Sequence, residues 1–123
     1  MEKIIKVGEY EFKAKSTAAS LFSYKANFAR DGIKDLITLS KGMSMEDDEK
    51  KTVDALVNNE NFEMDVFFRF LWVFAKAADQ KIPPFLEWLG TFEIPPFDFV
   101  FQALPQVQDM LVSTVQSSVK SKN

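Results

Sequence analysis

The sequence contains neither cysteine nor histidine. Without cysteine there can be no disulfide framework, no thiolate metal site and no thiol catalysis. Without histidine the chain lacks the commonest general base and the commonest metal ligand. A Ser–His or Cys–His nucleophile pair is therefore impossible, and the four glycines are too scattered to form a phosphate-binding loop. We expect a protein that is not an enzyme and that uses no cofactor and no metal.

Basic stretches and long hydrophobic runs are also missing. Fifteen Lys and Arg residues stand against 18 Asp and Glu, which gives a net charge of −3 and makes nucleic acid a poor partner. The most apolar stretch, residues 66–75, contains Arg69 and is shorter than the roughly 20 residues that a membrane span needs. No pattern of a secretory signal is present, so we expect neither a membrane partner nor export.

What the chain does contain is phenylalanine, with 13 Phe against two Trp and two Tyr. So many large rings indicate either a core built from them or apolar surface that meets a partner. Hydrophobic residues make up 46% of the 123 residues, enough for a globular core. We expect a mostly α fold in one domain, with a β-hairpin over residues 3–14, a helical region over residues 16–120 and no second domain.

The hairpin is predicted from alternation. Apolar residues alternate with charged ones on both sides of a Gly8-Glu9 dipeptide, and glycine at the first central position suits a type II′ turn. The apolar residues are Ile5, Val7, Tyr10, Phe12 and Ala14. Because a lone hairpin is marginal in water, its apolar face is expected to lie on the helices, although it could instead lend an edge to a neighbouring chain.

Ser16 or Thr17 is predicted to cap a helix that continues to about Arg30 and ends at Asp31-Gly32. A short helix should follow over residues 33–40. The apolar face of the first helix is expected to consist of Ala18, Leu21, Phe22, Phe28 and Ala29.

An acidic segment, residues 43–51, follows and resembles the capped start of another helix at Ser44. Its four acids at positions 46–49 could bind a cation. However, the run lacks the alternating ligands and central glycine of a calcium loop, and acids are favoured at a helix start. We therefore interpret it as solvated. The helix would carry Val53, Leu56 and Val57 and close at Asn58-Asn59.

Residues 62–80 are the strongest predicted helix, because apolar side chains cover almost every side of it. Such a helix is either the centre of the domain or its main contact with other subunits, and we favour the centre. Arg69 is expected to pair with Asp65 one turn earlier.

Two diproline segments follow. Ile82-Pro83-Pro84 should end the long helix and allow a short one over residues 85–89, stopped by Gly90. The break repeats at Ile94-Pro95-Pro96, after which we expect one helix over residues 98–104 that ends before Pro105 and another over residues 106–120.

Two further sites are conceivable in this region. Trp72 and Trp88, with Phe85 and Phe92, could form an aromatic pocket for a small molecule, as in a bacterial adaptor domain. Glu87 and Glu93 could form a carboxylate pair. Core packing explains the aromatic residues more simply, and the chain has many acids.

Residues 70–92 carry a resemblance. The segments Trp72-Val73-Phe74-Ala75-Lys76 and Phe85-Leu86-Glu87-Trp88-Leu89, placed after an N-terminal hairpin and separated by a break, resemble the tail assembly chaperones of long-tailed bacteriophages. The form is that of siphophages and prophages of Gram-positive bacteria. The residues that define this motif are Trp72, Ala75, Lys76, Phe85, Trp88 and Leu89.

The resemblance implies a protein that binds the tape measure protein, keeps it soluble and helps to recruit tail tube protein. Such chaperones act in the cytoplasm of the bacterial host and are absent from the mature virion. They commonly occur with a longer form made by a programmed frameshift, and Lys122-Asn123 could be encoded by a slippery A-rich site. The chain could also bind itself.

Candidate partner-binding residues lie on the last predicted helix, although core packing is an equal alternative for them: Val107, Met110, Leu111, Val115 and Val119. The turn at residues 97–101 is a second candidate, for which core packing is the better interpretation. The alternative function is that of a structural virion protein, such as a small tail completion or connector subunit.

Overall fold

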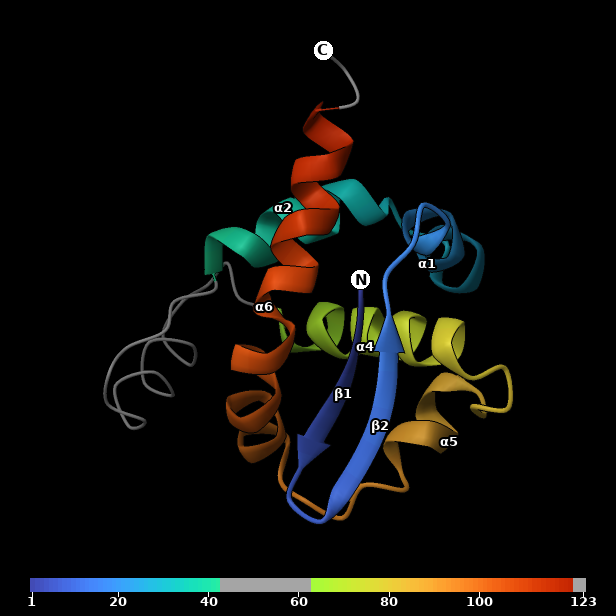
Figure 1. Cartoon of the computed structure of the whole chain (residues 1–123), viewed down its shortest axis with the longest axis vertical. Helices are drawn as coiled ribbons and strands as arrows, with labels where there is room; N and C mark the ends of the chain where they lie inside the picture. Colours follow the sequence, from blue (N-terminus) through green and yellow to red (C-terminus); the bar gives the residue numbers. More distant parts are fainter. Residues whose placement is uncertain (43–62, 121–123) are drawn as a thin grey trace.

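The computed structural model describes residues 1–42 and 63–120, and the side chains of residues 1–40 and 63–114. The chain is mostly helical with an N-terminal β-hairpin, as predicted (Figure 1). The acidic segment and the helix predicted around residues 53–59 lie outside the described residues. The elements are β1 (Glu2–Val7), β2 (Tyr10–Lys15), α1 (Ser20–Phe28), α2 (Gly32–Gly42), α4 (Met64–Ala78), α5 (Phe85–Leu89) and α6 (Pro96–Lys120).

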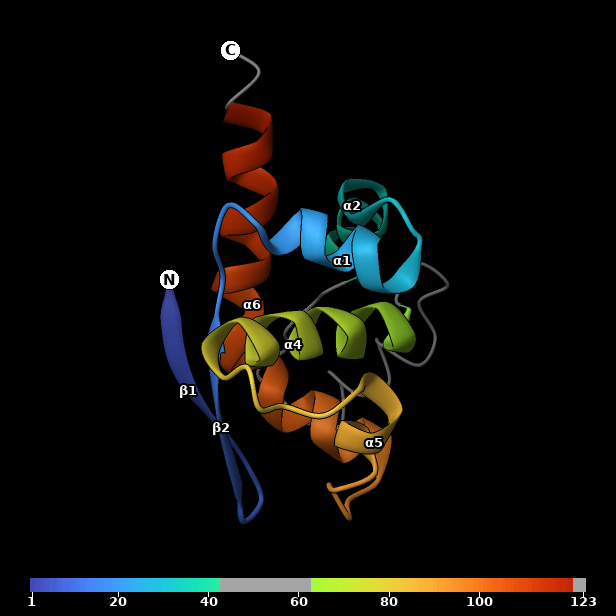
Figure 2. The ribbon, with the colours of Figure 1, turned by 90° about the vertical axis from the view of Figure 1, so that its right-hand side faces the viewer.

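The helices gather on one face of the hairpin (Figure 2). Helix α4 crosses behind β2, and α6 runs beside β1. Helices α1 and α2 lie on one side of α4, while α5 lies on the other side, beyond the edge of β2 (Figures 1 and 2). Because α4 contacts β2, α1, α2 and α5, it is the central helix that the sequence predicted.

The hairpin is antiparallel, and its register runs from Glu2 opposite Lys15 to Val7 opposite Tyr10. The two-residue loop between the strands begins with Gly8 at φ +60°, whereas Glu9 does not have a positive φ. A type I′ turn needs positive φ at both positions, so this geometry fits the predicted type II′ turn. The inward side chains of Ile5, Val7, Phe12 and Ala14 are buried.

Helix α4 supplies much of the core. Burying one phenylalanine side chain contributes about 1.5–3 kcal/mol, so this helix is the largest source of hydrophobic stabilisation in the described chain. The predicted ion pair between Arg69 and Asp65 forms at 3.0 Å. The buried residues of α4 are Val66, Phe67, Phe68, Phe70, Leu71, Trp72, Val73, Phe74 and Ala75.

The predicted start of the first helix is wrong. Helix α1 begins at Ser20 because Thr17 and Ser20 form a turn of their own. The Thr17 N–H donates to Ser20 Oγ at 2.9 Å, and Thr17 Oγ1 accepts from the Ala19 N–H at 3.1 Å. Side-chain hydrogen bonds of this kind compete with helical ones.

The predicted end and apolar face of this helix are also wrong. Ala29 takes the left-handed conformation that closes α1, and Asp31 Oδ1 instead accepts the N–H groups that open α2. The buried face of α1 carries Ser20 and Tyr24 and not the predicted Phe22. Phe22 is 77% exposed, while Tyr24 is fully buried against Phe70 with ring centroids 4.2 Å apart.

The two helices predicted on either side of Pro105 are one continuous helix, α6. An internal proline removes one helical hydrogen bond at a cost of about 3 kcal/mol or more. Burial on both sides offsets that cost, and Figure 2 shows that α6 bends, which is the usual consequence of an internal proline. The buried residues of α6 are Phe99, Val100, Ala103 and Leu104 before the proline, and Val107, Met110 and Leu111 after it.

Candidate functional site

The residues of the Trp–Ala–Lys segment hold the loop that follows α4. Trp72 Nε1 donates to the Pro83 carbonyl oxygen at 2.8 Å. Lys76 Nζ donates to the carbonyl oxygens of Gln80 and Ile82, both at 2.7 Å. Because prolines bring no N–H of their own, this loop has few internal hydrogen bonds to make. Side chains of α4 therefore fix its path.

The second half of the motif fastens α5 to the rest of the fold. The Trp88 ring packs edge-on against Phe12 of β2, with centroids 5.2 Å apart, and against Phe92 at 5.0 Å. The Phe85 ring contacts Phe28 at the end of α1, with centroids 5.2 Å apart. Helix α5 is therefore tied both to the hairpin and to α1.

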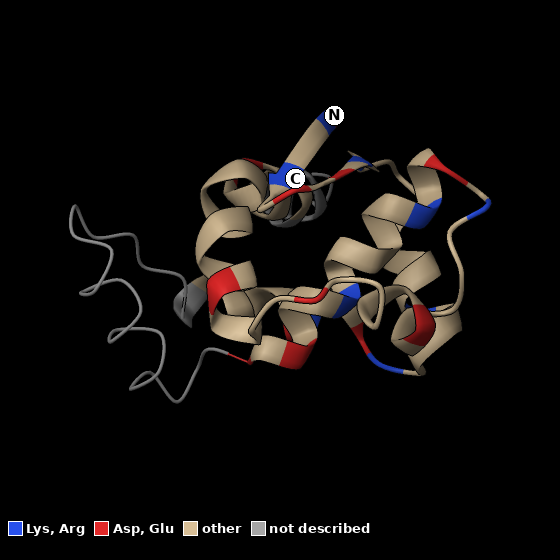
Figure 3. Cartoon of the chain, turned by 90° about the horizontal axis from the view of Figure 1, so that it is seen from below, with Lys and Arg blue, Asp and Glu red and all other residues tan. Residues whose placement is uncertain are grey.

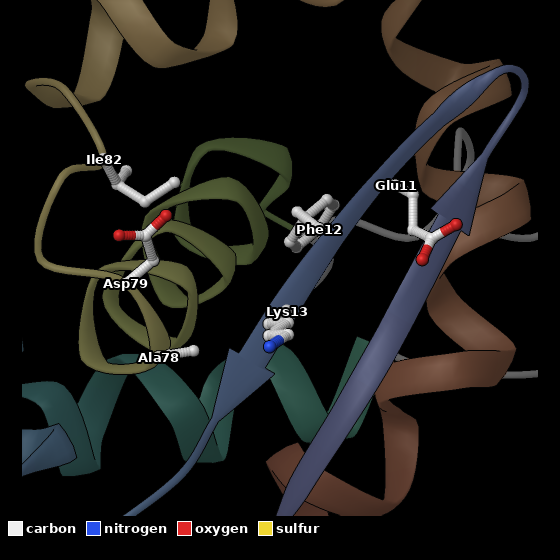
Figure 4. Close-up of a pocket in the computed structure, with 6 residues that line it drawn as sticks. All are labelled: Glu11, Phe12, Lys13, Ala78, Asp79 and Ile82. Atoms are coloured by element: carbon white, nitrogen blue, oxygen red, sulfur yellow. The ribbon is translucent and has the colours of Figure 1, made fainter.

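A groove lies between β2 and this clamped loop, and its volume is about 500 Å³. Phe12 from the strand and Ile82 from the loop face each other across it (Figure 4). Phe12 is only 9% exposed, so its ring belongs mainly to the groove floor. The lining residues are Glu11, Phe12, Lys13, Ala78, Asp79 and Ile82.

The outer edge of β1 is covered by side chains of α6 at Lys6 and Gly8. Gln106 Oε1 accepts from the Lys6 N–H at 2.9 Å, and Gln106 Nε2 donates to the Lys6 carbonyl oxygen at 2.7 Å. Gln102 Oε1 accepts from the Gly8 N–H at 2.7 Å. One glutamine thus supplies the donor and the acceptor that a neighbouring strand would supply.

The outer edge of β2 has no such cover. The register pairs Val7 with Tyr10 and Ile5 with Phe12 by hydrogen bonds, so the N–H and C=O groups of Glu11 and Lys13 point away from β1. Within the described part of the chain, no hydrogen bond reaches these groups. They form one wall of the groove.

No protein-family model, curated protein or solved structure matches this chain.

The six motif residues lie on α4 and α5, with Ala75 in the core and Leu89 packed against it, but the structure does not form the aromatic pocket considered from the sequence. Trp72 and Trp88 are 6% and 4% exposed, and other rings fill the space around each indole. Glu87 and Glu93 are both exposed, and neither lines the groove.

The predicted partner-binding residues of α6 lie in the core where they are described. Val107, Met110 and Leu111 have no exposed surface, so in this conformation a partner does not reach them. The side chains of Val115 and Val119 lie outside the described residues. Sequence reasoning missed the groove, because it arises from contacts between β2 and a loop almost 70 positions later, and no local pattern signals it. The one sequence feature that pointed toward the groove was the predicted hairpin, whose edge could pair with a neighbouring chain.

Another polar cluster lies at the junction of α1 and α2, where Asp35 and Tyr24 are buried and the Arg30 side chain is 49% exposed. Asp35 accepts hydrogen bonds from Arg30 Nε at 2.6 Å, from Arg30 Nη2 at 2.9 Å and from the Tyr24 hydroxyl at 2.8 Å. The Arg30 guanidinium holds the pKa of Asp35 below its usual value, and burial raises the pKa of Tyr24 to about 12. Each partner is satisfied at neutral pH, so we interpret the cluster as a structural link between the two helices.

Charged residues of the described chain are scattered. Acidic and basic positions are interspersed in the view of Figure 3 rather than separated onto different sides. Among the described residues, no group of three or more acidic side chains could hold a metal ion. Within the same residues, no helix combines the length and the apolar character needed to cross a membrane.

Proposed function

We propose that this chain is a tail assembly chaperone of a long-tailed bacteriophage. In this role it binds the tape measure protein, keeps that protein soluble and promotes assembly of the tail tube. It acts in the cytoplasm of the bacterial host and leaves before the virion is complete.

The observation that carries the proposal is the position of the residues that resemble this family. Trp72 and Lys76 donate hydrogen bonds to backbone carbonyl oxygens of the loop at residues 80–83, and the Trp88 ring packs against Phe12 of β2. These contacts build both walls of a surface groove. The resembling segment therefore shapes a surface that a partner can reach, in addition to filling the core.

Exposed apolar side chains support the same proposal. Phe22 on α1 and Leu86 on α5 are each 77% exposed, and Ile4 on β1 is 55% exposed. A protein that holds an apolar client needs accessible apolar surface, and interspersed charges keep that surface from aggregating while it is unoccupied.

The test is co-expression with the tape measure protein encoded in the same gene neighbourhood. We expect the tape measure protein to become soluble and to copurify with this chain, whereas an unrelated small helical protein leaves it insoluble. Replacing Phe22 and Leu86 by serine should weaken the effect without unfolding the chain, because both side chains are exposed. A tape measure protein that stays insoluble and unbound, even with a longer frameshifted form present, would overturn the proposal.

One further observation separates the chaperone from the structural virion protein. Purified particles should not contain the chain, and its presence there would favour a tail completion or connector subunit. The gene should carry a slippery heptamer near the codons of Lys122-Asn123, together with an overlapping −1 frame. A gene without either would remove the longer form from the list of partners, which otherwise includes the tail tube protein and the chain itself.

A further inference from the structure

We infer that the open edge of β2 binds an extended segment of a partner protein, which adds to the hairpin as a third, antiparallel strand. The chemistry of the edge supports this. The N–H and C=O groups of Glu11 and Lys13 face outward without a partner in the described chain, and backbone groups in that arrangement recognise another extended backbone. The inference deepens the proposed function and rests on it only in requiring a polypeptide partner.

The groove beside this edge has room for the side chains of an added strand. Residues of the partner opposite Phe12 would point inward, because neighbouring strands place paired residues on the same face. There they would meet Phe12, Ala78 and Ile82. Lys76 fixes the carbonyl oxygens of Gln80 and Ile82, so the far wall is already in position before a partner arrives.

Charge specifies which segment fits. Residues opposite Glu11, Lys13 and Lys15 would stand on the exposed face beside an acid, a base and a base. Opposite charges on paired residues stabilise a sheet and like charges destabilise it. For an antiparallel strand, the favoured partner therefore reads acidic, small apolar, acidic, apolar, basic from its N-terminus.

A single strand fits this edge better than a second copy of the chain. Helix α5 lies past the edge of β2 and on the helical side of the sheet (Figures 1 and 2). If a second copy paired through its own β2, its helix α4 would have to occupy the space that α5 already fills. The outer edge of β1 cannot pair with a strand along its whole length, because Gln106 already bonds both backbone groups of Lys6.

The experiment titrates the isotopically labelled full chain with capped hexapeptides and follows amide chemical shifts. The probe is Glu-Val-Glu-Leu-Lys-Val, written to lie opposite Lys15 through Tyr10. We expect shifts at Glu11 and Lys13 and none at Lys6, whose N–H is already bonded. The control peptide, Glu-Val-Lys-Leu-Glu-Val, exchanges the two charges at the centre and should bind more weakly.

Matched proline variants test the backbone contact. Lys13 and Ile4 are paired across the hairpin, and each directs its N–H outward, so proline at either position leaves the ladder between the strands intact. Lys13→Pro should weaken binding of the probe at least about tenfold, because it removes one backbone donor to the partner and also the Lys13 charge, whose share the charge-swapped variant below measures separately. Ile4→Pro should leave the affinity unchanged within about twofold.

A charge-swapped variant decides the matter if Lys13→Pro fails to fold. Glu11→Lys combined with Lys13→Glu keeps the backbone and should reverse the preference between the two peptides. Absence of shifts at Glu11 and Lys13 at millimolar peptide, or equal binding of both peptides by both proteins, would overturn the inference. So would a dimer of the free chain that Lys13→Pro abolishes, since the edge would then belong to a second copy.

These outcomes separate the inference from the proposed function. If the tape measure protein copurifies but the peptides do not bind, the chaperone stands and the strand site falls. If the peptides bind but the tape measure protein does not copurify, the strand site stands and its partner is another polypeptide.

Discussion

The two edges of the hairpin differ although both strands direct backbone groups outward. Charged and apolar residues alternate throughout β2, and in β1 they alternate from Ile5 to Val7. On β1 those groups at Lys6 are bonded by Gln106, whereas on β2 no described residue reaches Glu11 or Lys13. Protection of a sheet edge is thus supplied by a distant helix and not by the strand itself. An open strand edge beside a preformed groove is therefore a candidate site for binding another chain.

Removing the aromatic ring that supports the open edge of β2 should have the largest effect. Trp88→Ala deletes the ring that packs under Phe12, and we expect a loss of about 3–5 kcal/mol in the free energy of unfolding. Urea unfolding measures it. Leu86→Ala on the same helix is the control, because that side chain is 77% exposed and its loss should change stability by less than about 0.5 kcal/mol. Equal effects would show that α5 does not support the strand.

Opening the covered edge should have the next largest effect. Gln106→Ala removes both hydrogen bonds to Lys6 and should cost about 1–3 kcal/mol. Hydrogen exchange reports it directly, because the Lys6 amide should change from slow to fast exchange and so resemble Lys13. Gln108→Ala, two positions along the same helix, should leave the Lys6 amide protected. A Lys6 amide that exchanges rapidly in the unaltered protein would contradict the assigned cover.

The turn that joins the two edges gives a smaller effect. Gly8 has φ +60°, and an added Cβ would meet nothing within 4 Å, so Gly8→Ala suffers backbone strain without a clash. We expect a loss of about 1–2 kcal/mol in thermal or urea unfolding. Gly90→Ala is the matched control, because Gly90 has a helical φ of −66° and its Cβ would make only ordinary contacts. Equal losses at the two glycines would argue against the type II′ turn.

The ion pair at the covered edge should contribute least. Lys3 Nζ lies 2.6 Å from Asp109 Oδ2, but the Asp109 side chain is 55% exposed, so Asp109→Asn should cost at most about 1 kcal/mol at pH 7.

The pH dependence of this small effect has a definite sign. Lys3 lowers the pKa of Asp109, so the unfolded state binds a proton more readily than the folded state. The stabilisation is therefore complete above the unfolded pKa of about 3.9 and disappears as the pH falls through the lower folded pKa. Urea unfolding of both proteins at pH 7 and at strongly acidic pH should show the gap closing. A gap that widens in acid would contradict the pairing.

Local patterns predicted those parts of the fold that depend on neighbouring residues. Alternation around Gly8 gave the hairpin, and the all-round apolar pattern gave α4 as the central helix. The errors came where another contact outweighed a local signal. Burial before and after Pro105 carried α6 through a residue that usually stops a helix, and the turn made by Thr17 and Ser20 delayed the start of α1. Stacking of Tyr24 on Phe70 selected the buried face of α1 and left Phe22 exposed.

The candidate site could be predicted only in part. The motif residues from Trp72 to Trp88 were recognisable because they are close in sequence. The groove that they form against β2 could not be predicted, because it depends on the contact of Trp88 with Phe12 and on the hydrogen bond from Lys76 to Ile82. For the apolar stripe of α6, core packing was an equal alternative to partner binding, and it applies to Val107, Met110 and Leu111. An amphipathic helix buries its apolar face against whichever surface is available, and here that surface is the chain's own core.

The bonds that cover β1 also set an order of events during synthesis. Lys6 and Gln106 are 100 positions apart, and Lys3 and Asp109 are 106 apart. The hairpin therefore leaves the ribosome well before the helix that closes its outer side. Until that helix follows, the nascent chain exposes both sides of its two-stranded ribbon, and such long-range closure is slow relative to local folding. During this interval the polypeptide is itself a candidate for chaperone assistance.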